Sequence, residues 1–116
     1  MIKIAVDAMG GDNAPGEIVK GAVDAVIERN DITVCLTGQK DVIEKELSKY
    51  TYKREQIEIV DAPEVIETGE PPVNAIRKKK NSSLVVGLNL VKNGEADGFV
   101  SAGSSGAVLV GGQVIV

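Results

Sequence analysis

The chain has 116 residues, of which 43% are hydrophobic and 26% charged, and its formal net charge is −4. These values are typical of one globular domain or part of a larger one, and they argue against a disordered chain and against a general nucleic-acid binder. The single cysteine, Cys35, excludes an internal disulfide and a multi-cysteine zinc site, and the lack of histidine excludes a Ser-His-Asp or Cys-His mechanism within this chain.

The first half of the chain predicts three strands separated by two helices. The strands are short and β-branched, whereas the helices carry apolar residues at helical spacing. Asp41 and Glu44 have the spacing of a capping box at the start of the second helix. The expected strands are residues 2–6, 31–37 and 56–60, and the expected helices are residues 17–29 and 41–49.

The second half begins with an acidic, proline-containing segment that predicts an irregular connection. Asn81, Ser82 and Ser83 are typical helix-capping residues, and Gly94 is a typical helix terminator. The expected elements are the connection at residues 61–72, helices at 73–80 and 84–93, a strand at 96–101, a turn at 103–106 and an apolar helix at 107–116.

This alternation predicts an α/β fold with a mostly parallel sheet covered on both faces. We expect residues 1–116 to form a single α/β unit. The apolar stretch 108–116 has no capping residue after it, so we interpret the chain as the N-terminal part of a longer one. We also expect these residues alone to be inactive and poorly soluble.

The first segment that could carry chemistry is residues 7–15, which follow a strand and precede a helix. Gly10 and Gly11 allow close backbone approach, and the helix start offers free N–H groups to an anion. The segment contains neither the dinucleotide fingerprint nor a Walker A loop. A tight turn capped by Asp12 or Asn13 is the alternative interpretation.

The second segment is residues 101–106, Ser-Ala-Gly-Ser-Ser-Gly, after the fourth strand. Glycines and hydroxyls beside a helix N-terminus could hold an oxyanion or a phosphate. A glycine-rich turn with serine caps is the alternative. We expect Gly103 and Gly106 to frame an anion site.

The third segment, residues 77–83, begins with four consecutive cations in an acidic chain. Arg77 and Lys80, or Arg77 with Ser82 and Ser83, could converge on an anion such as phosphate. A run of charge is also what a solvated helix face looks like, so both interpretations stay open.

Two other residues are expected to be structural. Cys35 lies inside a predicted strand, which predicts a buried and inert thiol. Asp97 lies at the start of a predicted strand. The carboxylates show no metal-ligand spacing, so we predict no metal and no cofactor.

The three segments, read in order, resemble those of the bacterial phosphate acyltransferases of the PlsX family. The matching stretches are Val-Asp-Ala-Met-Gly-Gly-Asp-Asn-Ala-Pro at 6–15, Ala-Ile-Arg-Lys-Lys-Lys-Asn-Ser-Ser at 75–83 and Val-Ser-Ala-Gly-Ser-Ser-Gly-Ala at 100–107. Members of that family are considerably longer, and they usually have Asn-Thr where this chain has Ser104 and Ser105.

The resemblance implies an enzyme of phospholipid synthesis that transfers a fatty acyl group from acyl carrier protein to inorganic phosphate. It further implies a cytoplasmic homodimer, peripherally associated with the membrane, with a fold like isocitrate and isopropylmalate dehydrogenases. Such a reaction needs no enzyme nucleophile, because phosphate attacks an already activated thioester. The candidate catalytic residues are Asp7, Asp12 and Ser105, and the candidate phosphate- or substrate-binding residues are Gly10, Gly11, Asn13, Arg77, Lys80, Ser82, Ser101, Gly103, Ser104, Ser105 and Gly106.

Two other function classes remain as alternatives. One is a nonenzymatic module that binds an anion or a carrier protein. The other is a dehydrogenase of the related fold, which the missing dinucleotide fingerprint disfavours.

Overall fold

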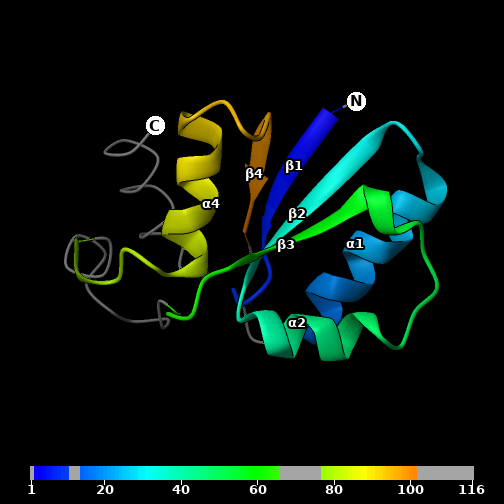
Figure 1. The fold of residues 1–116 in the computed structure, drawn as a ribbon, viewed down its shortest axis with the longest axis horizontal. Coiled ribbons are helices and arrows are strands. Elements are labelled where there is room, and N and C mark those ends of the chain that lie inside the picture. Colours follow the sequence, from blue (N-terminus) through cyan, green and yellow to red (C-terminus); the bar gives the residue numbers. More distant parts are fainter. Residues whose placement is uncertain (1, 11–13, 66–76, 102–116) are drawn as a thin grey trace.

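The computed structural model describes residues 2–10, 14–65 and 77–101, which form a parallel four-stranded sheet with helices on both faces (Figure 1). This arrangement confirms the predicted α/β class. The strands are β1 (Ile2–Asp7), β2 (Ile32–Gly38), β3 (Ile57–Asp61) and β4 (Gly98–Val100), and the helices are α1 (Gly16–Glu28), α2 (Lys40–Leu47), the 3-10 turn η1 (Arg54–Gln56) and α4 (Ser83–Lys92).

The strand order β3-β2-β1-β4 places a topological switch point beside β1. From β1 the chain winds through α1 and α2 toward β3, and α4 then carries it back to β4 on the other side of β1. Because crossovers between parallel strands are right-handed, the two winding directions put their helices on opposite faces. Figure 1 shows this division, with α1 and α2 on one face and α4 on the other.

The α1 and α2 face holds the larger apolar core. Val19, Val23 and Val26 of α1 are buried against Leu36 of β2 and Ile43 of α2. The apolar stripe predicted for α1 is therefore buried in part, since Ile18 and Ala25 of that stripe are only half-buried. On the opposite face, α4 buries Leu84, Val85 and Leu88.

The capping box predicted at Asp41 and Glu44 is wrong. Helix α2 begins one residue earlier, its N-cap is Gln39, and no side-chain cap bond is made there. The Lys40 backbone N–H instead donates to Asp61 Oδ1 at 3.3 Å, so a carboxylate from the end of β3 serves the helix start. Asp41 lies in the first turn, where its charge still suits the helix dipole.

Several predicted boundaries shift by one or two residues. Gln56 belongs to η1 rather than to β3, and Asp61, predicted in the connection, ends β3. The last strand is also shorter than predicted. Ala96, Asp97 and Ser101 lie outside β4.

The capping prediction for α4 is confirmed, with Ser82 as the N-cap. Its hydroxyl accepts a hydrogen bond from the Val85 backbone N–H at 3.2 Å, and Gly94 ends the helix with a φ of 75°. The short helix expected to reach Lys80 stops at residue 78, and residues 80 and 81 form a turn. The rest of that predicted helix, and the predicted elements 103–106 and 107–116, lie outside the described residues.

Candidate functional site

A buried carboxylate stands at the switch point of the sheet. Asp7 is the last residue of β1 and is only 2% exposed. Its Oδ1 accepts a hydrogen bond from the Ser83 hydroxyl at 2.5 Å, and its Oδ2 accepts one from the Ser101 hydroxyl at 2.9 Å. Oδ1 also accepts from the Met9 backbone N–H at 3.0 Å. One carboxylate thus holds the end of β1, the start of α4 and the residue after β4.

The three side chains joined by these bonds come from different sequence segments. Asp7 belongs to the segment 7–15, Ser83 to the segment 77–83 and Ser101 to the segment 101–106. Residues separated by 76 and 94 positions therefore meet at one carboxyl edge of the sheet. Ligands of open parallel sheets bind at this edge, at the switch point, so the meeting of the three segments marks the candidate site.

Ser82 and Ser83 take different roles in this arrangement. The sequence nominated Ser82 for substrate binding, but its hydroxyl caps α4 and its side chain is fully buried. Ser83, which the sequence analysis placed beside Arg77 as a possible anion ligand but left out of the final candidate residues, is the residue whose side chain contacts Asp7. The sequence signal for Ser83 was its position directly after the N-cap Ser82, because both hydroxyls lie at the start of α4.

A residue that the sequence analysis did not single out is Thr37, which is fully buried near the end of β2. Its hydroxyl donates to the Ser83 carbonyl oxygen at 2.8 Å and lies 3.3 Å from the Val6 carbonyl oxygen. The contact ties the first turn of α4 to the sheet beneath it. A threonine inside a strand has no pattern that would distinguish it from an ordinary β-former.

The glycine segment after β1 is only partly described. Gly10 is buried, and the Ala8 backbone N–H donates to the Thr37 carbonyl oxygen at 2.9 Å, which extends the pairing of the two strands past Asp7. Gly11, Asp12 and Asn13 lie outside the described residues.

The same limit applies to the glycine-serine segment. Ser101 is its only described residue, and the nominated Gly103, Ser104, Ser105 and Gly106 lie outside the described part of the chain.

The four consecutive cations do not point in one direction. Arg77, Lys78 and Lys80 are exposed, whereas Lys79 is half-buried and its Nζ donates to the Val65 carbonyl oxygen at 2.7 Å. Exposure of Arg77 and Lys80 is compatible with anion binding and also with a solvated surface. Among the cations of this run, Lys79 is the one that the structure shows bonded to a neighbouring segment.

The prediction of a buried Cys35 is confirmed. Its side chain is 2% exposed, and its Sγ lies 3.4 Å from Glu58 Oε2. Burial, and next the neighbouring Glu58 carboxylate, raise the pKa of this thiol to about 11. Because the thiolate is the nucleophilic form, Cys35 is unsuited to covalent catalysis near neutral pH.

Asp97 joins the amino ends of two strands, as the sequence suggested for a structural residue. Its Oδ2 accepts from the Lys3 backbone N–H at 2.8 Å, and its own N–H donates to the Lys3 carbonyl oxygen at 2.7 Å. Within residues 2–10, 14–65 and 77–101, no three metal-ligating side chains gather closely enough to hold an ion. Over the same residues, no helix combines the length and apolar character needed to cross a bilayer.

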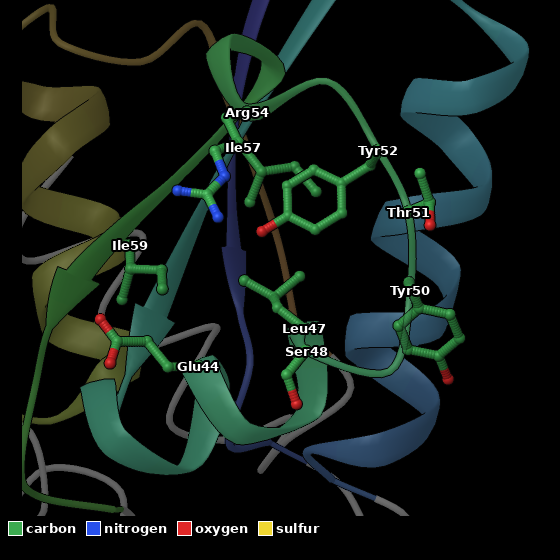
Figure 2. Close-up of a pocket in the computed structure, with 9 residues that line it drawn as sticks. All are labelled: Glu44, Leu47, Ser48, Tyr50, Thr51, Tyr52, Arg54, Ile57 and Ile59. Carbon is green, nitrogen blue, oxygen red and sulfur yellow. The ribbon is translucent and has the colours of Figure 1, made fainter.

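Two hollows on the α1 and α2 face differ in their relation to the site. One, of about 440 Å³, lies beside α1 and reaches Asp7 and Ser101. The other, of about 650 Å³, is lined by α2, η1, β3 and the residues before η1, with Tyr52 and Leu47 turned toward its centre (Figure 2). The second hollow is lined by none of the nominated site residues.

Comparison with known proteins supports the resemblance. The sequence profile of a family described as "Fatty acid synthesis protein" matches residues 2–116. The chain is 54% identical over 115 residues to a phosphate acyltransferase of Clostridium botulinum, covering 99% of this chain and 34% of that protein. It is 56% identical over 113 residues to one of Clostridium kluyveri and 52% identical over 115 residues to one of Clostridioides difficile, again covering 34% of each.

The chain thus spans about a third of the length of these curated relatives. Because the family profile covers residues 2–116, the assignment does not depend on any single motif. The chain belongs to the fatty acid synthesis protein family.

Proposed function

We propose that the full-length protein transfers a fatty acyl group from acyl carrier protein to inorganic phosphate. A phosphate oxygen attacks the thioester carbonyl, the carbon–sulfur bond breaks, and acyl phosphate and the carrier thiol are the products. Support comes from the names of the relatives, which are phosphate acyltransferases. Because both reactants already carry the reactive groups, the protein needs to position them and to stabilise the oxyanion that forms.

The observation that carries the proposal is the pair of hydrogen bonds from Ser83 and Ser101 to Asp7. These bonds join one residue from each of the three segments at the switch point, where an anion would lie next to backbone N–H groups and hydroxyls. In this proposal Asp7 is a positioning residue, because its oxygens hold the ends of the elements that surround the site. The glycine-serine segment that continues from Ser101 would bind phosphate.

The remaining nominated residues have assigned roles in the same proposal. Gly10, Gly11 and Asn13 would complete the phosphate site, while Arg77 and Lys80 would supply positive charge to phosphate or to the acidic carrier protein. Asp12 and Ser105 stay candidates for catalysis. The resemblance also supports a homodimer that works in the cytoplasm at the inner face of the membrane.

The decisive experiment incubates the purified full-length protein with acyl carrier protein thioesters and labelled inorganic phosphate, and measures the labelled acyl phosphate directly. Phosphate-dependent release of the carrier thiol, matched by acyl phosphate, is the expected result. Carrier or phosphate binding without product would instead favour the nonenzymatic binding module. Nucleotide binding with hydride transfer would favour the dehydrogenase.

A further inference from the structure

An apolar groove runs along β1 toward the candidate site. Its volume is about 440 Å³, within the range of roughly 300–1,000 Å³ that is usual for ligand pockets. The floor consists of alternate residues that face α1, among them Ile4 and Val6 of β1, Val34 of β2 and Val100 of β4. Val100 stays 57% exposed although it pairs with Val6 in the sheet.

Small residues of α1 border the groove. Gly21, Ala22 and Ala25 of α1 line one wall. Outside its own helix, a Cβ atom built at Gly21 would meet no atom of the described residues within 4 Å. Larger residues at these positions would narrow the groove.

The register of the sheet gives the groove a direction. Ile32, at one end, pairs with the first residue of β1, and Asp7, at the other end, is the last residue of β1. At about 3.3 Å per residue the floor is therefore roughly 17 Å long. It ends where Asp7 and Ser101 meet, and their side chains turn to the opposite face, toward Ser83. The apolar groove and the polar cluster thus adjoin at the carboxyl edge of the sheet.

We infer that this groove binds the fatty acyl chain of the acyl donor, an inference that rests on the proposed function. An acyl donor has an apolar tail and a reactive carbonyl, and the reaction requires that carbonyl to lie beside phosphate. A tail in the groove buries apolar surface along β1 and directs its carbonyl to the strand ends. The limited length of the groove then sets which acyl chains bind best.

Substitution of Gly21 in the full-length protein tests this inference directly. Gly21→Trp adds a large ring at the wall of the groove, where a Cβ atom meets no neighbour within 4 Å outside its own helix, whereas Lys20→Trp adds the same ring one residue away at an exposed position. Lys20 forms only an exposed ion pair with Asp24, so the control loses little. Hexadecanoyl and butanoyl thioesters of acyl carrier protein serve as donors, and the folding of each variant is checked by circular dichroism.

The expected result is a rise of about tenfold or more in KM for the hexadecanoyl donor with Gly21→Trp, because apolar burial is lost. The KM for the butanoyl donor should stay unchanged, and Lys20→Trp should resemble the unsubstituted chain with both donors. Gly21→Leu should give a smaller shift in the same direction.

Other outcomes separate the groove from the function. If the unsubstituted chain is active and Gly21→Trp keeps its KM for hexadecanoyl donor, the groove proposal is overturned while the proposed function stands. If the unsubstituted chain makes no acyl phosphate from either donor, the proposed function fails and the groove proposal falls with it. If Gly21→Trp and Gly21→Leu do not fold while Lys20→Trp does, protein atoms already fill the groove, which also overturns the proposal.

Discussion

The ring of Phe99 in β4 lies directly against Gly87 of α4. A Cβ atom built at Gly87 would come within 2.3 Å of Phe99 Cε1 and 2.8 Å of Cδ1, closer than any real Cβ contact. The glycine therefore allows the helix to pack closely on the strand that leads into the candidate site.

We predict that Gly87→Ala destabilises the full chain. Overpacking costs roughly 1–3 kcal/mol, and the better helix propensity of alanine returns about 1 kcal/mol of this. Urea unfolding measures the net change. The matched control is Gly21→Ala, the same replacement in the open wall of α1, which should stabilise the protein by roughly 0.5–1 kcal/mol. Equal effects at both positions would contradict the close packing.

The Asp7–Ser83 contact predicts a strong coupling between these residues. Ser83→Ala removes a buried hydrogen bond to a carboxylate, at a cost of roughly 1.5–3 kcal/mol in the free energy of unfolding. A double-mutant cycle with Asp7→Asn should give a coupling energy of about 0.5–3 kcal/mol. Ser48→Ala, which removes an exposed bond to the Lys45 carbonyl oxygen, is the control and should change stability by less than about 0.5 kcal/mol. Additive effects of the pair would count against a shared network.

The raised pKa of Cys35 predicts a fall in stability at high pH. The pKa is about 11 in the folded chain against an ordinary value of 9.0, so between these values the folded state holds a proton that the unfolded state has lost. Stability should be unaffected below pH 9.0 and should decrease by on the order of 2 kcal/mol as the pH rises toward 11. Unfolding curves of the parent chain and of Cys35→Ala should diverge over this window, and parallel curves would contradict the shift.

The exposed cations predict a binding defect without a folding defect. Arg77→Ala or Lys80→Ala should raise the apparent constant for phosphate or for acyl carrier protein by roughly ten- to hundredfold, the effect of losing one charge-assisted contact. Lys78→Ala, at an exposed position in the same run, is the control and should leave both constants unchanged. Unchanged constants for both Arg77→Ala and Lys80→Ala would leave this run of charge as a solvated surface.

The glycine-serine segment predicts a sharper effect. Gly103→Val should abolish phosphate use, because its side chain would keep an anion away from backbone N–H groups. Ser105→Ala should cost about 1 kcal/mol if its hydroxyl donates one neutral hydrogen bond. Phosphate-dependent kinetics are measured beside circular dichroism, so that loss of activity in a folded Gly103→Val chain can be assigned to the site. Normal phosphate kinetics for this variant would leave the segment as an ordinary turn.

The elements of the fold were predictable because their signals are local. The apolar stripe of α1, the cap at Ser82 and the terminator Gly94 each act within a few residues. The false capping box shows the limit of such signals: Asp41 lies near the right place, but Asp61, 21 residues from Lys40, makes the bond to the helix start. A tertiary contact replaced the local one.

The site was predictable in outline and not in its contacts. Asp7 could be nominated because it follows a buried strand, and Ser101 because it precedes a glycine-rich segment. That Ser83 rather than Ser82 contacts Asp7 depends on the strand order and on the rotation of α4 above β1. Neither quantity is encoded in the spacing of residues along the chain.

The reciprocal bonds between Lys3 and Asp97 have a consequence for how the molecule is built. They join positions 94 residues apart, so β1 and β4 must pair across a long intervening stretch of chain. During synthesis β1, β2 and β3 leave the ribosome long before β4 does, and the hydrogen-bonding groups along one side of β1 meanwhile have no strand beside them. Such an edge can capture other extended chains, and long-range pairing is slow. This side of β1 in the nascent protein is therefore exposed to mispairing until residues 97–100 emerge and pair with it.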